Sequence, residues 1–242
     1  MREKPVKLSL VTIGQSPRND LWDEIAQNLD FPFESYHFGL LDTPESLERL
    51  LAGSSEKEIL VTQLRTGDAA RISSQKAHPA LINLIAEIAK WEKPDAIIVL
   101  CTGIREPESA FPFPVIYPGV LIRNKVMENP VELTGVILPD KNQWDWLDPE
   151  LKKRKAILFE IDPPGTEQEF QKAADYLTDR KVRSVIFHCM GYPLSAAAPF
   201  SSDFTEQIAH PRLLISQALN QRFGNILPQR THRPRRGGAA AK

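Results

Sequence analysis

Short apolar runs alternate with helical segments along most of the chain. Runs rich in apolar and β-branched residues predict strands at 6–14, 33–41, 58–64, 95–101, 133–139, 155–161 and 182–189. Between them, amphipathic spacing, turn residues and capping residues predict helices at 17–30, 43–52, 75–91, 118–129, 144–154 and 166–180. Segment 65–73 is expected to form a turn and a short extra strand, and the C-terminal region two helices at 202–209 and 213–223.

Regular alternation of helices with near-continuously apolar strands is typical of parallel sheets covered by helices on both faces. We therefore predict an α/β fold, and 242 residues suffice for two such lobes. Segment 102–114, "TGIREPESAFPFP", is crowded with proline and phenylalanine and cannot continue a regular element for long. We expect a functional loop there, with the chain crossing between the lobes within 104–118 and the folded part ending near residue 227.

Composition limits where the protein acts. The longest apolar runs are far shorter than the about 20 residues that a membrane helix needs. The first residues, "MREKPVKLSL", lack the apolar stretch of a signal peptide, so the cytoplasm is the expected compartment. Two cysteines in 242 residues fit this view, because a secreted chain more often carries several paired ones. Both thiols are expected to be free.

Charge is unevenly distributed. The formal net charge is −1, but residues 228–242 carry five basic residues and no acidic one, which leaves −6 for the rest of the chain. An acidic body argues against a nucleic-acid surface. The tail, "PQRTHRPRRGGAAAK", has no apolar periodicity and is predicted to be disordered.

Both cysteines occupy the same kind of position. Cys101 ends "DAIIVLC" and Cys189 ends "VRSVIFHC", and a glycine follows each two places later, Gly103 and Gly191. In α/β folds ligands bind outside the carboxyl ends of the strands. If the two strands are equivalent in their lobes, the thiols face each other across the cleft and can remove and donate protons on opposite faces of one carbon. The alternative is that each is a small buried hydrophobe.

The segment "GQSPR", residues 14–18, lies between the first strand and the first helix. Backbone amides at a helix start favour an anion, Ser16 can donate to an oxyanion, and Arg18 can bind a carboxylate through two nitrogens. Gln15 belongs to the same segment, and Arg65, just after the third strand, is a second candidate cation. The alternative for 16–18 is an ordinary helix start with Ser16 as N-cap.

Other motifs are absent from the sequence. It contains no phosphate-binding loop, dinucleotide fingerprint, zinc-protease motif or nucleophile elbow, and its five histidines are scattered. We therefore expect neither a metal nor a cofactor. His188 precedes Cys189 on a strand, so its side chain is expected to point to the opposite face and to be buried.

Three segments together resemble the AroM family: "LVTIGQSPRND" at 10–20, "VLCTG" at 99–103 and "HCMGY" at 188–192. The resemblance extends from about residue 8 to about residue 219. That family is similar to the aspartate/glutamate/hydantoin racemase superfamily. The resemblance implies two pseudo-symmetric α/β lobes, each contributing one cysteine to a cofactor-independent site.

The resemblance also implies roles for individual residues. Cys101 and Cys189 match the acid/base thiols, and Thr102 matches a polar residue after the first cysteine. Gly191 and Tyr192 would shape the second half-site. Superfamily racemases usually have asparagine and then threonine after the first cysteine, whereas Thr102 and Gly103 stand here. This departure leaves the substrate class open.

The function that we expect is racemisation or epimerisation of a small carboxylate or amide. One alternative is a decarboxylase or isomerase of the same superfamily that uses a single cysteine. Another is a non-catalytic protein that binds a small molecule. The sequence leaves open whether the chain forms a homo-oligomer.

Overall fold

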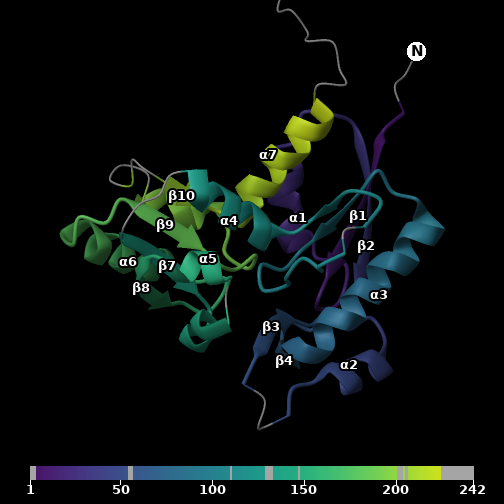
Figure 1. Ribbon diagram of the computed structural model, residues 1–242, viewed down its shortest axis with the longest axis horizontal. Helices are drawn as coiled ribbons and strands as arrows, with labels where there is room; N and C mark the ends of the chain where they lie inside the picture. The colour runs from purple at the N-terminus through teal and green to yellow at the C-terminus, as the bar shows by residue number, and fades with distance from the viewer. Residues whose placement is uncertain are drawn as a thin grey trace, which may run out of the picture.

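Two four-stranded parallel sheets form the centre of two lobes (Figure 1). The computed structural model describes residues 4–53, 57–109, 111–128, 133–146, 148–200, 204 and 207–224. The first sheet has the order β2-β1-β5-β6 and the second the order β10-β9-β7-β8. The strands are β1 (Val6–Thr12), β2 (Phe33–Gly39), β5 (Ala96–Val99), β6 (Val115–Ile116), β7 (Leu133–Leu138), β8 (Lys155–Glu160), β9 (Ser184–Phe187) and β10 (Gln207–Ala209). The predicted α/β fold with two lobes is confirmed.

The two sheets have the same topology. In each, the first strand along the chain lies between the second and the third, and the fourth lies outside the third. Val11 of β1 pairs with Val99 of β5, and Ile137 of β7 pairs with Phe187 of β9. Cys101 and Cys189 each stand two residues beyond the paired residue of their strand. The cysteines therefore occupy equivalent positions in the two lobes.

Among the described residues, the first lobe contains three helices, near the positions that the sequence predicts. They are α1 (Asn19–Ala26), α2 (Pro44–Leu50) and α3 (Ser74–Glu92). Thr43 caps α2, since its side chain accepts a hydrogen bond from the backbone N–H of Ser46. One core cluster joins α3 to one face of this sheet, and α1 packs with Leu8 and Leu10 on the other.

In the second lobe the helical segments are η1 (Lys141–Trp146), α5 (Pro149–Lys152), α6 (Glu167–Asp179) and η2 (Leu194–Phe200). The helix expected at 144–154 is thus two short pieces, because Asp148 and Pro149 start a new helix. A capping box between Thr166 and Glu169 starts α6.

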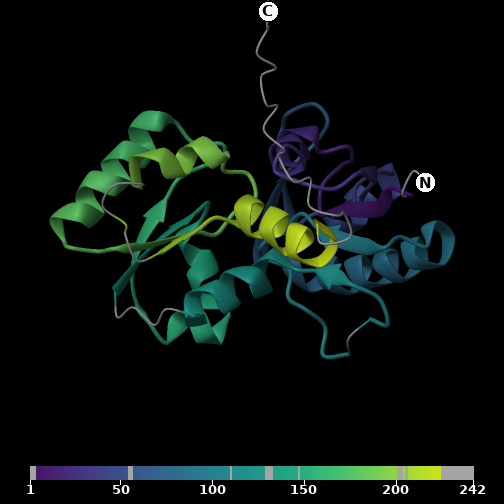
Figure 2. The same cartoon turned by 90° about the horizontal axis from the view of Figure 1, so that it is seen from above.

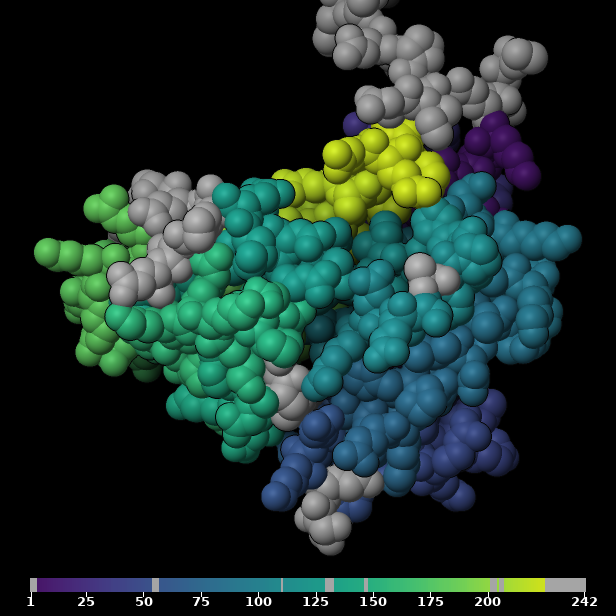
Figure 3. All heavy atoms as spheres, viewed as in Figure 1, coloured from purple at the N-terminus to yellow at the C-terminus, as the bar shows by residue number. Residues whose placement is uncertain are grey.

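Two helices join the lobes. The chain leaves the first sheet after β6 and enters α4 (Pro118–Glu128), whose Ile122 and Val126 belong to the second lobe's core. The last helix, α7 (Pro211–Phe223), follows β10 but buries Ile215 and Leu219 with α1 in the first lobe's core. Figure 2 shows α7 running between the lobes, and in Figure 3 it lies across the top of the seam where they meet.

Two further sequence expectations differ from the structure. The helix predicted at 202–209 is wrong where the structure describes it, because 207–209 form β10 and pair with β9, whose edge supplies hydrogen-bonding groups. Strand β3 (Ile59–Gln63) stays outside the main sheet and pairs antiparallel with β4 (Ala69–Ser73). A turn with Gly67 at φ +92° connects them.

Residues 228–242, expected to be disordered, lie outside the described residues. Within the described part, none of the helices has the length and apolarity needed to cross a membrane.

Candidate functional site

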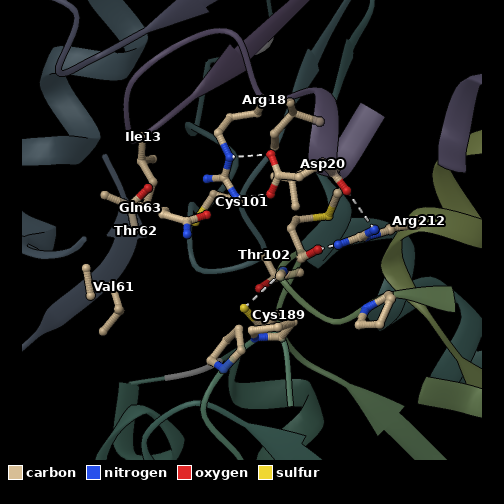
Figure 4. A pocket seen from close by; sticks show the side chains of 18 of the residues that line it. Ile13, Arg18, Asp20, Val61, Thr62, Gln63, Cys101, Thr102, Cys189 and Arg212 are labelled. Atoms are coloured by element: carbon tan, nitrogen blue, oxygen red, sulfur yellow. Dashed lines mark hydrogen bonds and ion pairs between the residues drawn. The ribbon is translucent and has the colours of Figure 1, made fainter. Parts of the chain in front are cut away.

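A cavity of about 400 Å³ lies where the carboxyl ends of the two sheets face each other. Both cysteines line it, one from each lobe (Figure 4). Its wall is formed by Ile13, Arg18, Asp20, Leu21, Glu24, Val61, Thr62, Gln63, Gly67, Ala69, Leu100, Cys101, Thr102, Pro163, Pro164, Cys189, Met190, Gly191, Pro193 and Arg212.

Both thiols are free and partly buried, and each packs against the core of its own lobe. Burial raises the pKa of Cys101 to about 12, opposed by the backbone amides of Gly103 and Ile104 and by Arg18. Burial also raises the pKa of Cys189, opposed by the Gly191 amide, which donates to its Sγ at 3.3 Å, and by nearby arginines. Each thiol is therefore protonated at neutral pH, with donors placed to stabilise a transient thiolate.

Arg18 lies in the cavity wall at the start of α1, with 13% of its side chain exposed. Its Nε and Nη2 donate to the two carboxylate oxygens of Asp20 at 2.8 and 2.7 Å. This pair fixes the guanidinium plane and neutralises one charge. The helix begins at Asn19 with Arg18 at the N-cap, so the alternative of Ser16 as N-cap is wrong.

Arg212, in the first turn of α7, is a cavity residue that the sequence analysis missed. Its side chain is 4% exposed. Nη1 donates to Glu24 Oε2 at 2.6 Å and to the Asp20 carbonyl at 3.0 Å, and Nε donates to the Met190 carbonyl at 2.9 Å. A buried cation of this kind joins α1, the segment after Cys189 and α7.

A signal for Arg212 does exist in the sequence. Arg212, Ile215 and Leu219 recur at the spacing of one helix face, and the other two are fully buried. An arginine on such an apolar face requires a buried partner or a ligand. That partner, Glu24, stands 188 residues away in the sequence.

Five of the predicted binding residues are not in the cavity wall, and three of these, Gln15, Ser16 and Arg65, contact one another instead. Ser16 donates through its hydroxyl and its amide to Asp42, at 2.7 and 2.8 Å. Arg65 also binds Asp42, at 2.9 Å, and donates to the Ser16 carbonyl, while Gln15 accepts from the Arg65 amide. These residues form a network that holds the loops after β1, β2 and β3 together.

Thr102 and Gly191 line the cavity, whereas Gly103 and Tyr192 do not. Thr102 Oγ1 donates to the His188 carbonyl at 3.1 Å, a bond between the two lobes. Gly191 is needed because a Cβ there would lie 2.6 Å from Pro163 Cβ. Tyr192 is fully buried and donates to the Ile161 carbonyl at 2.7 Å, so it supports the second half-site from inside the lobe.

The hairpin β3–β4 adds a wall to the cavity on the first lobe's side through Val61, Thr62 and Gln63, which the sequence analysis did not identify. It can approach closely because Gly14 lacks a side chain: a Cβ there would lie 2.3 Å from Thr62 Oγ1. Figure 4 shows Val61, Thr62 and Gln63 on one side of the cavity and Arg212 on the other.

The cavity combines two thiols, two arginines, two carboxylates and apolar surface. Each carboxylate is paired with one arginine, so the lining is close to electrically neutral. Among the described residues, no cluster of three or more His, Cys, Asp or Glu is placed to hold a metal ion. The arrangement suits a small molecule with an anionic group and an apolar part.

Solved structures share this fold at low sequence identity. Allantoin racemase from Pseudomonas fluorescens aligns with a TM-score of 0.54 and 12% identity, over 98% of this chain and all of that one. Glutamate racemase RacE1 from Bacillus anthracis gives 0.55 and 15%, over 93% and 84%. A double mutant of arylmalonate decarboxylase in its liganded form gives 0.53 and 10%, over 88% and 92%. These similarities show the racemase-type fold.

Among curated protein sequences, none matches the chain at a significant level. The sequence profile described as AroM protein matches residues 8–223, which includes both cysteines and every element from β1 to α7 except the first two residues of β1. The chain therefore belongs to the AroM protein family.

Proposed function

We propose that the protein is a cofactor-independent racemase or epimerase of a small carboxylate or amide, with Cys101 and Cys189 as the acid and base. The observation that supports this most directly is that two thiols at equivalent positions of two lobes line one cavity. Two proton carriers on opposite sides of a carbon are what inversion of that carbon requires.

The proposed chemistry transfers one proton on each side of the substrate. A thiolate removes the proton from the carbon next to the carbonyl, which leaves an enolate, and the opposite thiol donates its proton to the other face. The first cysteine ends as a thiol and the second as a thiolate, so reversal uses the same groups. Because burial disfavours both thiolates, each is a strong base when it forms.

Arg18 and Arg212 are the proposed holders of the substrate's carboxylate. Among the described residues, Arg18 uses Nε and Nη2, and Arg212 uses Nε and Nη1. One terminal nitrogen of each guanidinium therefore has no protein partner in the described part of the chain. A carboxylate that accepts from these nitrogens would also stabilise charge developing on the enolate.

A one-cysteine decarboxylase or isomerase is the second candidate. The observation that favours it is the position of Thr102, whose hydroxyl donates to the His188 carbonyl and so directs its proton away from the cavity. The two half-sites are therefore not chemically identical next to their thiols. A non-catalytic binding protein would need the same cavity but neither thiol.

The test is incorporation of solvent deuterium at the α-carbon of candidate substrates. The purified protein is incubated in D₂O with amino acids, hydantoins and hydroxy acids, and each product is analysed by mass and by chirality. Exchange with loss of optical purity is expected for one class. Exchange with retained configuration, or release of CO₂, would favour the second candidate, and exchange that persists without both thiols would overturn both.

A further inference from the structure

A second cavity, of about 240 Å³, lies behind the segment that follows Cys101. Thr102 lines this cavity as well as the first one. The other walls come from both lobes: residues 103–107, the first turns of α4 at Gly119, Val120 and Arg123, the start of α5 at Asp148 and Pro149, and His188. The proposed racemisation uses none of these other residues.

His188 lines this cavity and is almost fully buried. It is 4% exposed, and its Nδ1 is buried without a hydrogen-bond partner among the residues that the structure describes. Burying a polar atom without a partner is unfavourable. Because His188 lines the cavity, a small turn of its ring would let a bound ligand supply the hydrogen bond that Nδ1 lacks.

Arg123 provides hydrogen-bond donors. Its Nη1 donates to Asp148 Oδ2 at 3.2 Å, and among the described residues this is its one hydrogen bond. Asp148 also accepts from the Glu150 amide through Oδ1, so both of its oxygens have partners. Among the described residues, the groups at this cavity that still lack a partner are mainly the other guanidinium nitrogens of Arg123, which are donors. The ligand should present acceptors.

Other charges at this cavity lie on exposed residues. Arg105 and Glu106 have opposite sign and are solvent-exposed.

The first turn of α4 approaches the Thr102 carbonyl, since a Cβ on Gly119 would lie 2.8 Å from that oxygen. The positive end of this 11-residue helix adds to the potential of Arg123.

We infer that this second cavity binds a small oxyanion, a carboxylate or phosphate group, and that its occupancy changes the reactivity of both cysteines. The path from this cavity to the two thiols is short. Thr102 follows Cys101, His188 precedes Cys189, and Thr102 Oγ1 donates to the His188 carbonyl. An anion bound by His188 and Arg123 would therefore act on a hydrogen bond that connects the two cysteine segments.

The test needs no substrate. Protein labelled with ¹⁵N-histidine is titrated separately with inorganic phosphate and with acetate, and the ring signals of His188 are followed. A saturable shift is expected that Arg123→Gln abolishes and Arg18→Gln, in the first cavity, leaves in place. The anion that binds more tightly identifies the oxyanion class.

A second measurement tests the connection to the thiols. The alkylation rates of Cys101 and Cys189 with iodoacetamide are compared with and without the saturating anion. The comparison is made in the Arg18→Gln background, where carboxylate binding in the first cavity is weakened. Both rates are expected to change there, and not when Arg123→Gln is added, whereas adding Arg71→Gln, an exposed arginine elsewhere, should leave the change in place. No saturable shift, a shift that survives Arg123→Gln, or unchanged alkylation despite a shift would each overturn the inference.

Discussion

The two lobes share one topology but build different half-sites. Cys101 and Cys189 follow equivalent strands, yet the first lobe adds the hairpin β3–β4 over its thiol and the second lobe contributes Pro163 and Pro164 instead. The cations are also placed unequally, Arg18 on α1 and Arg212 on α7. Equivalent strands place the thiols, whereas loops and connecting helices determine on which side of the cavity the hairpin, the prolines and the cations lie.

The largest expected effect comes from the thiols. If both half-sites act, Cys101→Ser and Cys189→Ser should each lower racemisation by about 10²–10⁴-fold, because a serine hydroxyl is a poor substitute as acid or base. Each variant should still exchange the α-proton of one enantiomer, and the two variants should prefer opposite enantiomers. Chiral analysis with deuterium exchange measures both. Full activity in either variant would exclude the two-thiol mechanism.

Arg212 should matter for stability as well as for ligand binding. Arg212→Met leaves the Glu24 carboxylate with the Leu194 amide but without its cation, and the Met190 carbonyl without the Arg212 donor; breaking a buried ion pair costs about 3–5 kcal/mol. Urea unfolding measures the free-energy change. Arg222→Met, at the exposed end of the same helix, is the matched control and should change stability little. Equal effects of the two changes would contradict this role for Arg212.

Variants of Arg18 and Arg65 should distinguish an effect on ligand binding from an effect on loop structure. Arg18→Gln should weaken the binding of a carboxylate ligand about 10- to 100-fold, since a charged hydrogen bond is worth about 1.5–3 kcal/mol. Arg65→Gln should lose its ion pair with Asp42 and leave affinity nearly unchanged, because Arg65 is outside the cavity wall. Calorimetric titration of both variants compares them. A larger loss of affinity in Arg65→Gln than in Arg18→Gln would mean that Arg65 belongs to the binding site.

The pH dependence of thiol reactivity should distinguish Cys101 from an ordinary cysteine. The thiolate is the reactive form, and burial raises the pKa of Cys101 to about 12. Its alkylation should therefore be at least about tenfold slower near pH 8 than that of an exposed peptide thiol, and should still be rising above pH 10. Mass spectrometry of alkylated peptides gives the profile for each cysteine. A plateau near pH 9 for Cys101 would contradict the effect of burial.

The sequence by itself determined most of the secondary structure. Apolar runs, Thr43 and the Thr166 capping box act within a few residues, so strands and helix starts are visible locally. The same short-range patterns place both cysteines at the ends of strands. The motif 14–18 was recognised as well, although Arg18 lines the cavity and Ser16 and Gln15 stabilise loops instead.

Only the tertiary structure decided which polar groups meet. Strand β10 forms because β9 offers an edge to pair with, and β3 pairs with β4 outside the main sheet. Arg212 reaches the cavity because α7 returns to the first lobe, where Glu24 lies 188 residues earlier in the chain. Such pairings depend on packing between distant segments, because a guanidinium is buried only where another part of the fold compensates its charge.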